Sequence, residues 1–343
     1  MPGDLHAATG GYGYDRRIVC GLRALGWSVT VNALDASFPF PTAAAIDHAR
    51  TVFDGIRAAS LTLIDGLALG AMPEVVGPHG QRLRLVALVH HPLAAESGLL
   101  PDVARRLECS ERLALQSVRH VVVTSAVTAE AVARYEVDRA RISVVQPGTD
   151  EAPLARVSAA GIVNILCVAT VIPRKGHDVL IDSLISLASL QWRLTCVGSL
   201  TRSPVMVDRL RQKLRDAALT ERVTLAGEMS EGELAACFQS ADLFVLATRH
   251  EGYGMAVAEA LAHGLPVVST RTGAIPEIAG EGAGLLVPPD DVDAFREALA
   301  HVLRDPVFLG SLREGARRVR DNLRRWPESC SRMSQVLESV TQP

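Results

Sequence analysis

The sequence predicts an α/β fold made of two domains, each built on a parallel sheet. In both halves, short runs of Val, Ile and Leu alternate with longer segments whose apolar residues recur at helical spacing. The short runs lack polar alternation, which is typical of strands buried on both faces of a parallel sheet. A turn-rich stretch at 147–161 separates the halves, and the length of 343 residues suits two domains.

The second half shows the clearer pattern. Its apolar runs are spaced so that one helix fits between successive strands. The segment 290–305 opens with two aspartates, which suit the N-terminus of a helix. We expect strands at 162–171, 192–199, 222–228, 242–248, 265–270 and 284–289, and helices at 177–190, 204–219, 233–241, within 248–264, at 274–280 and at 290–305.

The first half follows the same logic. We expect strands at 28–34, 61–69, 82–91, 120–125 and 141–148, and helices at 14–26, 42–59, 102–118 and 126–135. A domain of this kind normally opens with a buried strand that leads into a glycine-rich loop, but here only MPGDL precedes HAATGGYG. Either the first strand is missing from this sequence, or the sheet is built without it.

These patterns define the expected domains. Residues 1–155 form an N-terminal domain and residues 156–320 form a C-terminal domain. The remaining segment, 321–343, is expected to form a last helix, which can cross back to the first domain.

Composition excludes several classes of protein. The chain is 48% hydrophobic with a net charge of −3, so it is neither disordered nor a dedicated nucleic-acid binder. Its six cysteines show neither a C-x-x-C pair nor zinc spacing, which indicates a reducing compartment. No signal peptide and no run of 18 apolar residues is visible. We therefore expect a cytoplasmic protein without a membrane span, and leave open attachment to the inner membrane face.

Two glutamates mark the first candidate site. Glu251 follows the strand 242–248, and ligands of open parallel sheets bind beyond the carboxyl ends of strands. Gly252 and Gly254 permit close backbone approach, and the next helix offers free amides. Glu259 lies about two turns along that helix. A carboxylate can accept two hydrogen bonds from a sugar diol, although an ordinary strand-turn-helix would also explain these residues.

The wider pattern here, E-G-x-G-M-x-x-x-E-A-L-A-x-G-x-P-V-V-S-T, resembles the E-x7-E signature of retaining, nucleotide-sugar-dependent glycosyltransferases of family 4. PEI at 276–278 and GLLVPP at 284–289 extend the resemblance. It is strong over about 162–300 and weaker before. It implies the GT-B architecture, in which two Rossmann-like domains face each other across a cleft. It also implies donor-binding roles for Gly252, Tyr253, Gly254, Met255 and Glu259.

A basic pair follows the strand 162–171. Arg174 and Lys175 precede Gly176 at the start of a helix, where cations and free amides suit a diphosphate. Alone, this pair would fit an ordinary basic cap. By resemblance, Lys175 matches the lysine that holds the donor diphosphate. The family's usual G-R pair is replaced by Ala-Thr at 169–170, so we expect Arg174 to supply the second cation.

Two histidines, His90 and His91, end the strand 82–91. We interpret His90 as a capped or core histidine. His91 matches the family's histidine that contacts the donor sugar near its primary alcohol. Glu96, five residues on, is interpreted as a surface residue or an acceptor contact.

Two further loops match the family by resemblance. Gly10 and Gly11 match the N-terminal G-G loop, whose amides approach the donor phosphate or the acceptor. Gly227, Glu228 and Met229 match the loop that reads the nucleotide base through its backbone. A glycine loop and a strand-to-helix turn are weak signals when taken alone.

The resulting expectation is a retaining hexosyltransferase that uses a nucleoside-diphosphate sugar, with a UDP-sugar favoured. His91, Glu251, Arg174 and Lys175 are the candidate catalytic residues. The two cations and helix amides would stabilise the leaving diphosphate. No D-x-D motif marks a metal site, and neither a metal nor another cofactor is expected. The acceptor is a small molecule, a lipid or a glycan.

Two other functions stay open at this stage. A nucleotide-sugar epimerase on the same fold would act without an acceptor. A non-catalytic sugar-nucleotide-binding protein would need no intact reaction centre. The joint presence of Glu251, Lys175 and His91 argues against the second alternative, because a degenerate site commonly loses one of its residues.

Overall fold

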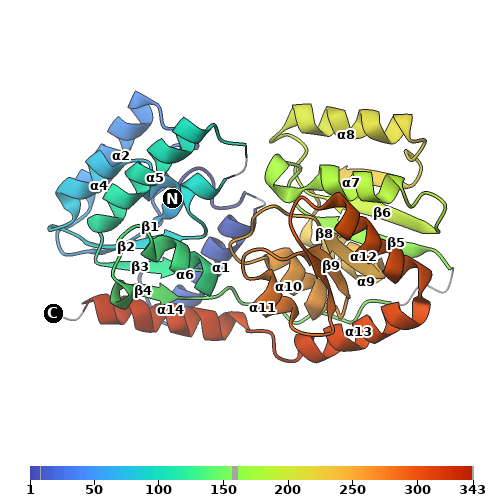
Figure 1. Cartoon of the computed structure of the whole chain (residues 1–343). Helices are drawn as coiled ribbons and strands as arrows, with labels where there is room; N and C mark the ends of the chain where they lie inside the picture. The colour runs from blue at the N-terminus through green and yellow to red at the C-terminus, as the bar shows by residue number, and fades with distance from the viewer. Residues whose placement is uncertain (8, 97, 157–160, 342–343) are drawn as a thin grey trace. The chain divides into compact units, whose positions relative to one another are not determined.

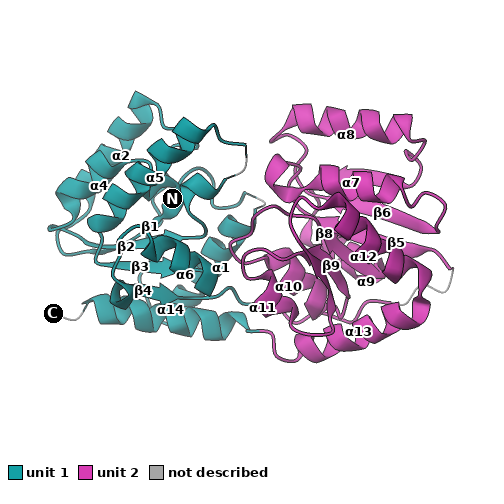
Figure 2. Cartoon of the chain, viewed as in Figure 1, with its two compact units in different colours: residues 1–148, 324–343 teal, residues 149–323 magenta. Residues whose placement is uncertain are grey.

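The computed structural model describes residues 1–7, 9–96, 98–156 and 161–341. These residues form two compact units, shown in different colours in Figure 2. Unit 1 comprises residues 1–148 and 324–343, and unit 2 comprises residues 149–323. The sequence pattern places the divisions after residues 155 and 320 instead. Part of the expected joint at 150–160 lies outside the described residues.

Unit 2 carries a six-stranded parallel sheet in the order β10-β9-β8-β5-β6-β7. Figure 1 labels β5, β6, β8 and β9 of this sheet. Its central strand β8 is buried at every position, as the unbroken apolar run predicts. The six expected strands and the helices between them are confirmed. The strands are β5 (Val163–Val168), β6 (Trp192–Val197), β7 (Val223–Gly227), β8 (Leu243–Leu246), β9 (Val267–Thr270) and β10 (Gly284–Val287).

The helices of unit 2 follow the strands in turn. Phe238 of α9, Phe244 of β8 and Phe295 of α12 belong to a single hydrophobic core formed by the sheet and these helices. The elements are η3 (Pro173–Lys175), α7 (His177–Ile185), α8 (Pro204–Asp216), α9 (Glu231–Ser240), α10 (Met255–Ala262), α11 (Ile275–Ala279), α12 (Val292–Arg304) and α13 (Pro306–Arg320).

Unit 1 carries a smaller parallel sheet in the order β1-β2-β3-β4. Its strands are β1 (Leu61–Asp65), β2 (Arg84–Val89), β3 (His120–Val123) and β4 (Ile142–Val144). Each lies within an expected strand, but the expected strand 61–69 is only half right, because residues 66–69 form a short helix. The helices are α1 (Gly10–Ala24), α2 (Ala43–Gly55), α3 (Gly66–Leu69), α4 (Pro73–His79), η1 (Leu93–Ala95), α5 (Pro101–Gln116), α6 (Ala126–Ala133), η2 (Arg139–Arg141) and α14 (Trp326–Thr341).

The expected strand at 28–34 is wrong. Residues 27–33 belong to neither helix nor strand, and Leu34 forms one isolated parallel bridge with Pro2. The alternation of Val29 and Val31 with polar residues is compatible with a strand, but a strand also needs a hydrogen-bonded neighbour. Within the described residues, the sheet of unit 1 ends at β1 instead.

The C-terminal helix α14 belongs to unit 1 and packs along α1. A side chain at Gly21 of α1 would place its Cβ 2.1 Å from the Sγ of Cys330, so only glycine permits this approach. The indole Nε1 of Trp27 donates to the Oγ of Ser334 at 2.9 Å. The last helix thus covers the first helix of the same unit.

Candidate functional site

The carboxyl edge of the unit 2 sheet contains a topological switch point. From β5, the chain order runs to β6 and β7 on one side and to β8, β9 and β10 on the other. Strands β5 and β8 are hydrogen-bonded neighbours, so the loops that follow them start side by side. Open α/β sheets bind their ligands at such a point. Arg174 and Lys175 follow β5, and Glu251 follows β8.

The two loops approach each other closely at Gly176. Its φ is +66°, and an added Cβ would lie 1.9 Å from the carbonyl oxygen of Ala247. Glycine is therefore required for two separate reasons. The backbone amide of Arg249 donates to the carbonyl of Arg174 at 2.7 Å, and the hydroxyl of Thr248 donates to the same carbonyl at 3.1 Å. These bonds fix the basic pair against the loop that carries Glu251.

Lys175 and Glu251 form an ion pair between Nζ and Oε1. Their side chains are only 17% and 9% exposed, so the pair is largely shielded from water. The guanidinium of Arg174 donates from Nη1 to the carbonyl of His250 at 3.1 Å. The structure therefore brings together three of the four predicted catalytic residues. The cations of Arg174 and Lys175 and the carboxylate of Glu251 thus lie together at the carboxyl edge of the sheet.

The backbone of Glu251 is also fixed from the other side. Gly273, in the loop after β9, has a φ of +54°, and an added Cβ would lie 1.9 Å from the carbonyl oxygen of Glu251. Three neighbouring loops thus pack backbone against backbone at the candidate site. Such close packing holds the carboxylate of Glu251 in a defined place.

Arg249 is a residue of this site that sequence reasoning missed. Its guanidinium donates to both carboxylate oxygens of Asp178, at 3.0 and 2.8 Å, and to Asp290 at 2.6 Å. It also donates to the carbonyl of Pro173. Arg249 thus joins the loops that follow β5, β8 and β10. The only signal in the sequence is its position two residues before Glu251.

The charges of this network reinforce each other. Burial raises the pKa of the Asp178 carboxyl, but the hydrogen bonds and charge of Arg249 outweigh burial and lower the pKa overall. Hydrogen bonding to Asp178 raises the pKa of Arg249 in turn. The two consecutive aspartates before α12 have different partners. Asp290 pairs with Arg249, whereas Asp291 accepts from the amide of Ala294 and caps α12.

The predicted donor-binding residues near Glu251 lie at the start of α10. Gly254 is the N-cap, with a φ of +108°, and α10 begins at Met255. Its first amides have no partner within the helix and suit an anionic or hydroxylated ligand. Glu259 is half-buried in the second turn. Tyr253 is buried and belongs to the core of unit 2, while Gly252 is half-buried in the loop before α10.

The predicted base-reading residues lie further along the same edge. Gly227 ends β7, the outermost strand, and its φ of +77° favours glycine. Its carbonyl accepts from the amide of Gly198 at 2.8 Å. Glu228 is exposed and Met229 is half-buried. Both lie between β7 and the capping box of α9 at Ser230. A loop of this kind presents backbone groups more than side chains.

In unit 1, His90 is half-buried in a polar cluster just after the end of β2. Its Nε2 lies 3.2 Å from Asp15 Oδ1 and 3.8 Å from Asp65 Oδ2. Burial lowers the pKa of His90, but the two carboxylates outweigh it and raise the pKa above its ordinary value. Burial and the charge of Asp15 raise the pKa of Asp65 to about 6. The two carboxylates thus hold the His90 ring at the end of β2 and favour its protonated form relative to an ordinary histidine.

The glycines expected in a loop before a helix form the first turn of α1 instead, and this turn packs on the cluster. Thr9 caps α1 by accepting from the amide of Tyr12 at 3.4 Å, and Gly10 is the first residue of the helix. A Cβ at Gly11 would lie 3.5 Å from the ring of His90, at ordinary contact distance. Gly11 thus lies against the half-buried histidine, while Gly10 is exposed.

His91 points to a different partner. Its Nε2 lies 3.7 Å from Oε2 of Glu96, which is 37% exposed. The loop between them is held by Glu111 of α5, whose Oε2 accepts from the amide of Leu93 at 2.9 Å. Burial raises the pKa of Glu111 to about 8. Sequence reasoning missed Glu111, because nothing in the pattern of α5 shows that its polar position faces inward.

Two groups of described residues have ligand atoms close enough to hold a metal ion. Asp15, Asp65 and His90 form one, and Cys167, His177 and Cys196 form the other, with all ligand atoms of each group within 4.8 Å of one another. The second group lies in the core of unit 2, between β5, β6 and the start of α7. In the part of the chain that the structure describes, no helix is long and apolar enough to cross a membrane.

Comparison with known families extends over both units. Residues 163–305 match the family model described as glycosyl transferases group 1, and residues 16–152 match glycosyltransferase family 4. A D-inositol 3-phosphate glycosyltransferase of Pseudarthrobacter chlorophenolicus is 31% identical over 259 residues, which are 71% of this chain and 61% of the relative. An MMP alpha-(1->4)-mannosyltransferase of Mycolicibacterium hassiacum is 26% identical over 321 residues, 89% of this chain and 76% of the relative.

Solved structures give the same picture of the fold. Sucrose-phosphate synthase from Thermosynechococcus elongatus superposes with a TM-score of 0.82 at 22% identity, covering 98% of this chain and 96% of that chain. Anabaena HepE, solved with UDP and glucose, gives 0.72 at 18% identity, covering 91% and 86%. The predicted GT-B fold is confirmed. The chain spans about three fifths of the length of the D-inositol 3-phosphate glycosyltransferase that it matches.

Proposed function

The chain belongs to the group 1 glycosyltransferases of family 4, and from this premise we propose that it transfers a hexosyl unit from a nucleoside-diphosphate sugar to a hydroxyl acceptor, with retention of configuration. The observation that carries the proposal is the shielded ion pair of Lys175 and Glu251 at the switch point of the unit 2 sheet. This pair places a phosphate-binding cation beside a sugar-binding carboxylate.

The donor diphosphate binds to Arg174, Lys175 and the amides at the start of α7. In the structure described here, the ammonium of Lys175 is engaged by Glu251. A diphosphate offers a stronger anionic partner, so its arrival draws Lys175 away from the carboxylate. Glu251 is then released to accept hydrogen bonds from two hexose hydroxyls. Donor binding thereby assembles the sugar site.

Catalysis in this proposal is electrostatic. As the glycosidic bond to the diphosphate breaks, negative charge grows on the leaving phosphate and positive charge on the sugar. Arg174 and Lys175 stabilise the first, and the carboxylate of Glu251 stabilises the second without forming a covalent bond. The acceptor hydroxyl passes its proton to the leaving phosphate. These charges are supplied by side chains and amides, so the proposal assigns no metal.

The remaining predicted residues bind the rest of the donor. Met255 and the glycines before it present the amides of α10, and Glu259 binds a second diol. Gly227, Glu228 and Met229 face the base. In unit 1, His91 binds the sugar near its primary alcohol, and Gly10 and Gly11 approach the phosphate or the acceptor. The acceptor is an unidentified small molecule, lipid or glycan.

A binding screen tests the donor first. Thermal shift with UDP, GDP, ADP and TDP, and with their common glucose, mannose, galactose and N-acetylglucosamine sugars, finds the base by mass action. UDP-sugars are the first choice because HepE was solved with UDP and glucose. A clear shift with one base supports the donor site. No shift with any nucleotide would favour a non-catalytic protein.

Transfer itself is tested with Glu251→Gln, which keeps the size of the side chain and removes its charge. The variant should fold and bind nucleotide but lose at least about 100-fold in transfer rate. Glu231→Gln changes an exposed glutamate of the same unit and serves as the matched control. An unchanged rate in Glu251→Gln would exclude the assigned role, and conversion of the donor sugar to its epimer without an acceptor would identify an epimerase.

A further inference from the structure

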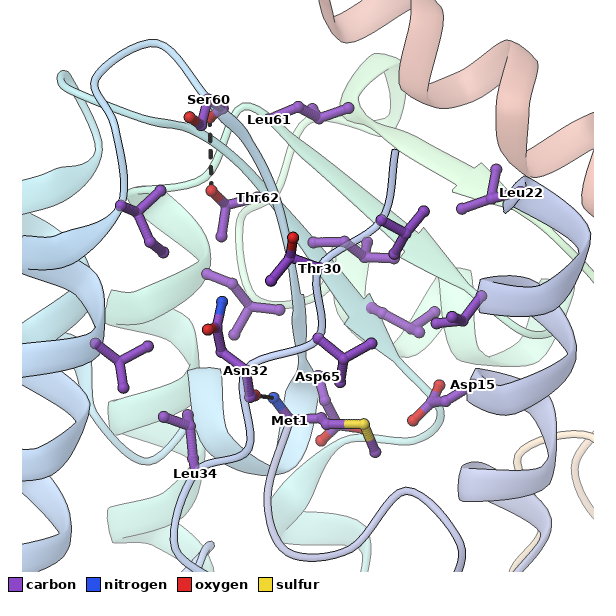
Figure 3. A pocket seen from close by; sticks show the side chains of 18 of the residues that line it. Met1, Asp15, Leu22, Thr30, Asn32, Leu34, Ser60, Leu61, Thr62 and Asp65 are labelled. Carbon is purple, nitrogen blue, oxygen red and sulfur yellow. Dashed lines mark hydrogen bonds between the residues drawn. The ribbon is translucent and has the colours of Figure 1, made fainter. Parts of the chain in front are cut away.

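Unit 1 contains a cavity of about 790 Å³ that the proposed reaction does not use (Figure 3). One wall consists of the consecutive residues 60–65, and the opposite wall includes the consecutive residues 27–32. Successive residues of a strand point to opposite faces. A cavity lined by six residues in a row on each side therefore lies beside the edges of two extended segments, not above one face.

The first wall is the open edge of the sheet. Strand β1 is the end of the order β1-β2-β3-β4, and among the described residues it pairs with β2 alone. Its other row of amides and carbonyls faces the cavity. Open edges of this kind are templates for a further strand. Leu61 and Leu63 beside the cavity are apolar, and Asp65 at the end of β1 is the one acidic or basic residue of this strand, so most of the edge lacks the charges that usually protect it.

The second wall already carries the beginning of a parallel ladder. The amino group of Met1 donates to the carbonyl of Asn32 at 3.1 Å, the amide of Leu34 donates to Met1 at 2.7 Å, and the amide of Gly3 donates to Leu34 at 2.8 Å. Figure 3 shows Met1 beside Asn32, with Thr30 further along the same segment. Met1 and Gly3 thus run parallel to 32–34, and Met1 also lines the cavity.

The direction of this ladder determines what fits the cavity. In a parallel pair the two chains advance together, so a residue before Met1 would lie beside residues 28–31. Those residues form the wall of the cavity opposite β1. A strand that ends at Met1 would accordingly run between the two walls, with hydrogen-bond partners on both sides.

We propose that the cavity is the seat of a buried parallel β-strand that is continuous with Met1–Gly3, so that the native polypeptide carries an apolar segment immediately before Met1. The segment spans about five to six residues, the length of the walls. It completes a six-stranded sheet in which residues 28–34, a strand in the pattern of the sequence but not in the structure, become the outer strand.

The surroundings specify the chemistry of this segment. Ile18 and Leu22 of α1, Leu88 of β2 and Leu337 of α14 line the cavity. A strand covered on both faces by such residues is a continuous run of Val, Ile and Leu. Burial lowers the pKa of the Met1 amino group despite the nearby carboxylates of Asp65 and Asp15. A peptide bond at Met1 would replace this buried amine with a neutral amide that keeps the bond to Asn32.

A strand in this cavity would also affect the polar cluster around His90. Asp65 ends β1 and Asp15 lies on α1, and both line the cavity while contacting His90. The missing strand would run past them toward the start of α1 at Gly10. Its insertion would fix the position of the Asp15–Asp65–His90 cluster beside that first turn.

The position of the natural N-terminus tests whether this segment exists. The protein is produced from its own chromosomal locus with a C-terminal tag, and its N-terminal peptide is determined by mass spectrometry. We expect residues upstream of Met1, with an apolar run of five or more. A native N-terminus at Met1 would overturn the proposal.

Hydrogen exchange then tests the position of the segment. The native polypeptide is compared with the chain that begins at Met1. The amides of 61–65 and 28–34 should exchange more than about tenfold more slowly in the native polypeptide, because both walls gain hydrogen-bond partners. The amides of β8 in unit 2 are the internal control and should not change. Equal exchange at both walls would place the upstream residues elsewhere. Neither measurement depends on glycosyl transfer.

Discussion

The ammonium of Lys175 and the carboxylate of Glu251 form an ion pair across the loops that follow β5 and β8. The pair exists because these two strands are neighbours in space although 76 residues separate the two side chains along the chain. Breaking a largely buried pair costs more than breaking an exposed one, because it leaves a charge without a partner.

Removing the ammonium should therefore damage both stability and activity. Lys175→Met is expected to lower the free energy of unfolding by about 1–3 kcal/mol. It should also lower kcat/KM by at least about 100-fold through loss of the diphosphate contact. The double variant Lys175→Met, Glu251→Gln should regain stability, since no unpaired charge remains, yet stay inactive. Chemical denaturation and donor-turnover assays measure the two effects separately. Retained activity in either variant would contradict the assigned roles.

The chain offers a direct probe of Lys175, because Lys175 and Lys213 are its only lysines. Lys213 pairs with Asp182 at 2.5 Å and is 43% exposed. Amine acylation followed by peptide mass spectrometry should show Lys175 protected several-fold by a bound nucleoside diphosphate, because the phosphates shield the ammonium. Labelling of Lys213 should stay constant and serves as the internal control. Equal labelling of Lys175 with and without nucleotide would place the diphosphate elsewhere.

The strands of unit 2 could be predicted from the sequence because short apolar runs alternate with helical patterns, most clearly at the fully buried strand β8. The same reasoning wrongly predicted a strand at 28–34. The alternation of apolar and polar residues there is typical of a strand, but a strand also needs a neighbouring strand for its hydrogen bonds, which the pattern of the segment does not reveal. In the structure, a cavity lined by Met1 and β1 lies beside this segment.

The candidate site, too, could be predicted from the sequence only in part. Glu251 and Lys175 were identifiable as residues after strands, because ligands gather at such ends. Their mutual pairing was not, since it depends on the strand order. Arg249 gave no signal beyond its position near Glu251, and Glu111 gave none, because an arginine in a loop and a glutamate in a helix are ordinarily solvated. Only the packing around them shows that one joins three loops and the other is buried.

Arg249 is expected to act as a positioning residue. Arg249→Lys keeps the charge but loses the paired bonds to Asp178 and the bond to Asp290. The loop that carries Arg174 and Lys175 should loosen, which raises the dissociation constant of the nucleoside diphosphate about tenfold. Calorimetry of nucleotide binding measures this effect. Arg296→Lys alters the ion pair of the half-buried Arg296 with the exposed Asp293 on α12 and is the control. A variant with unchanged nucleotide affinity and a lower melting temperature would show a purely structural role.

Glu111 should make stability depend on pH. Its pKa is raised from an ordinary value of 4.5 to about 8 in the folded chain, so the folded state holds a proton that the unfolded state has lost. The contribution of Glu111 to the free energy of unfolding is therefore largest below about pH 4.5, and it declines as the pH rises toward 8. The difference between the two values bounds the loss at roughly 5 kcal/mol.

The variant Glu111→Gln stays neutral at every pH and can still accept the bond from Leu93. Its melting temperature should match that of the unmodified chain near pH 5 and exceed it increasingly up to pH 8, because only the unmodified chain must bury a carboxylate or hold a proton there. Asp102→Asn, at an exposed position of the same helix, should shift stability by a similar amount at every pH in this range. A constant gap between Glu111→Gln and the unmodified chain from pH 5 to 9 would show that Glu111 is ionised in the folded protein. The loop after His91 would then be held by a charged carboxylate instead of a neutral one.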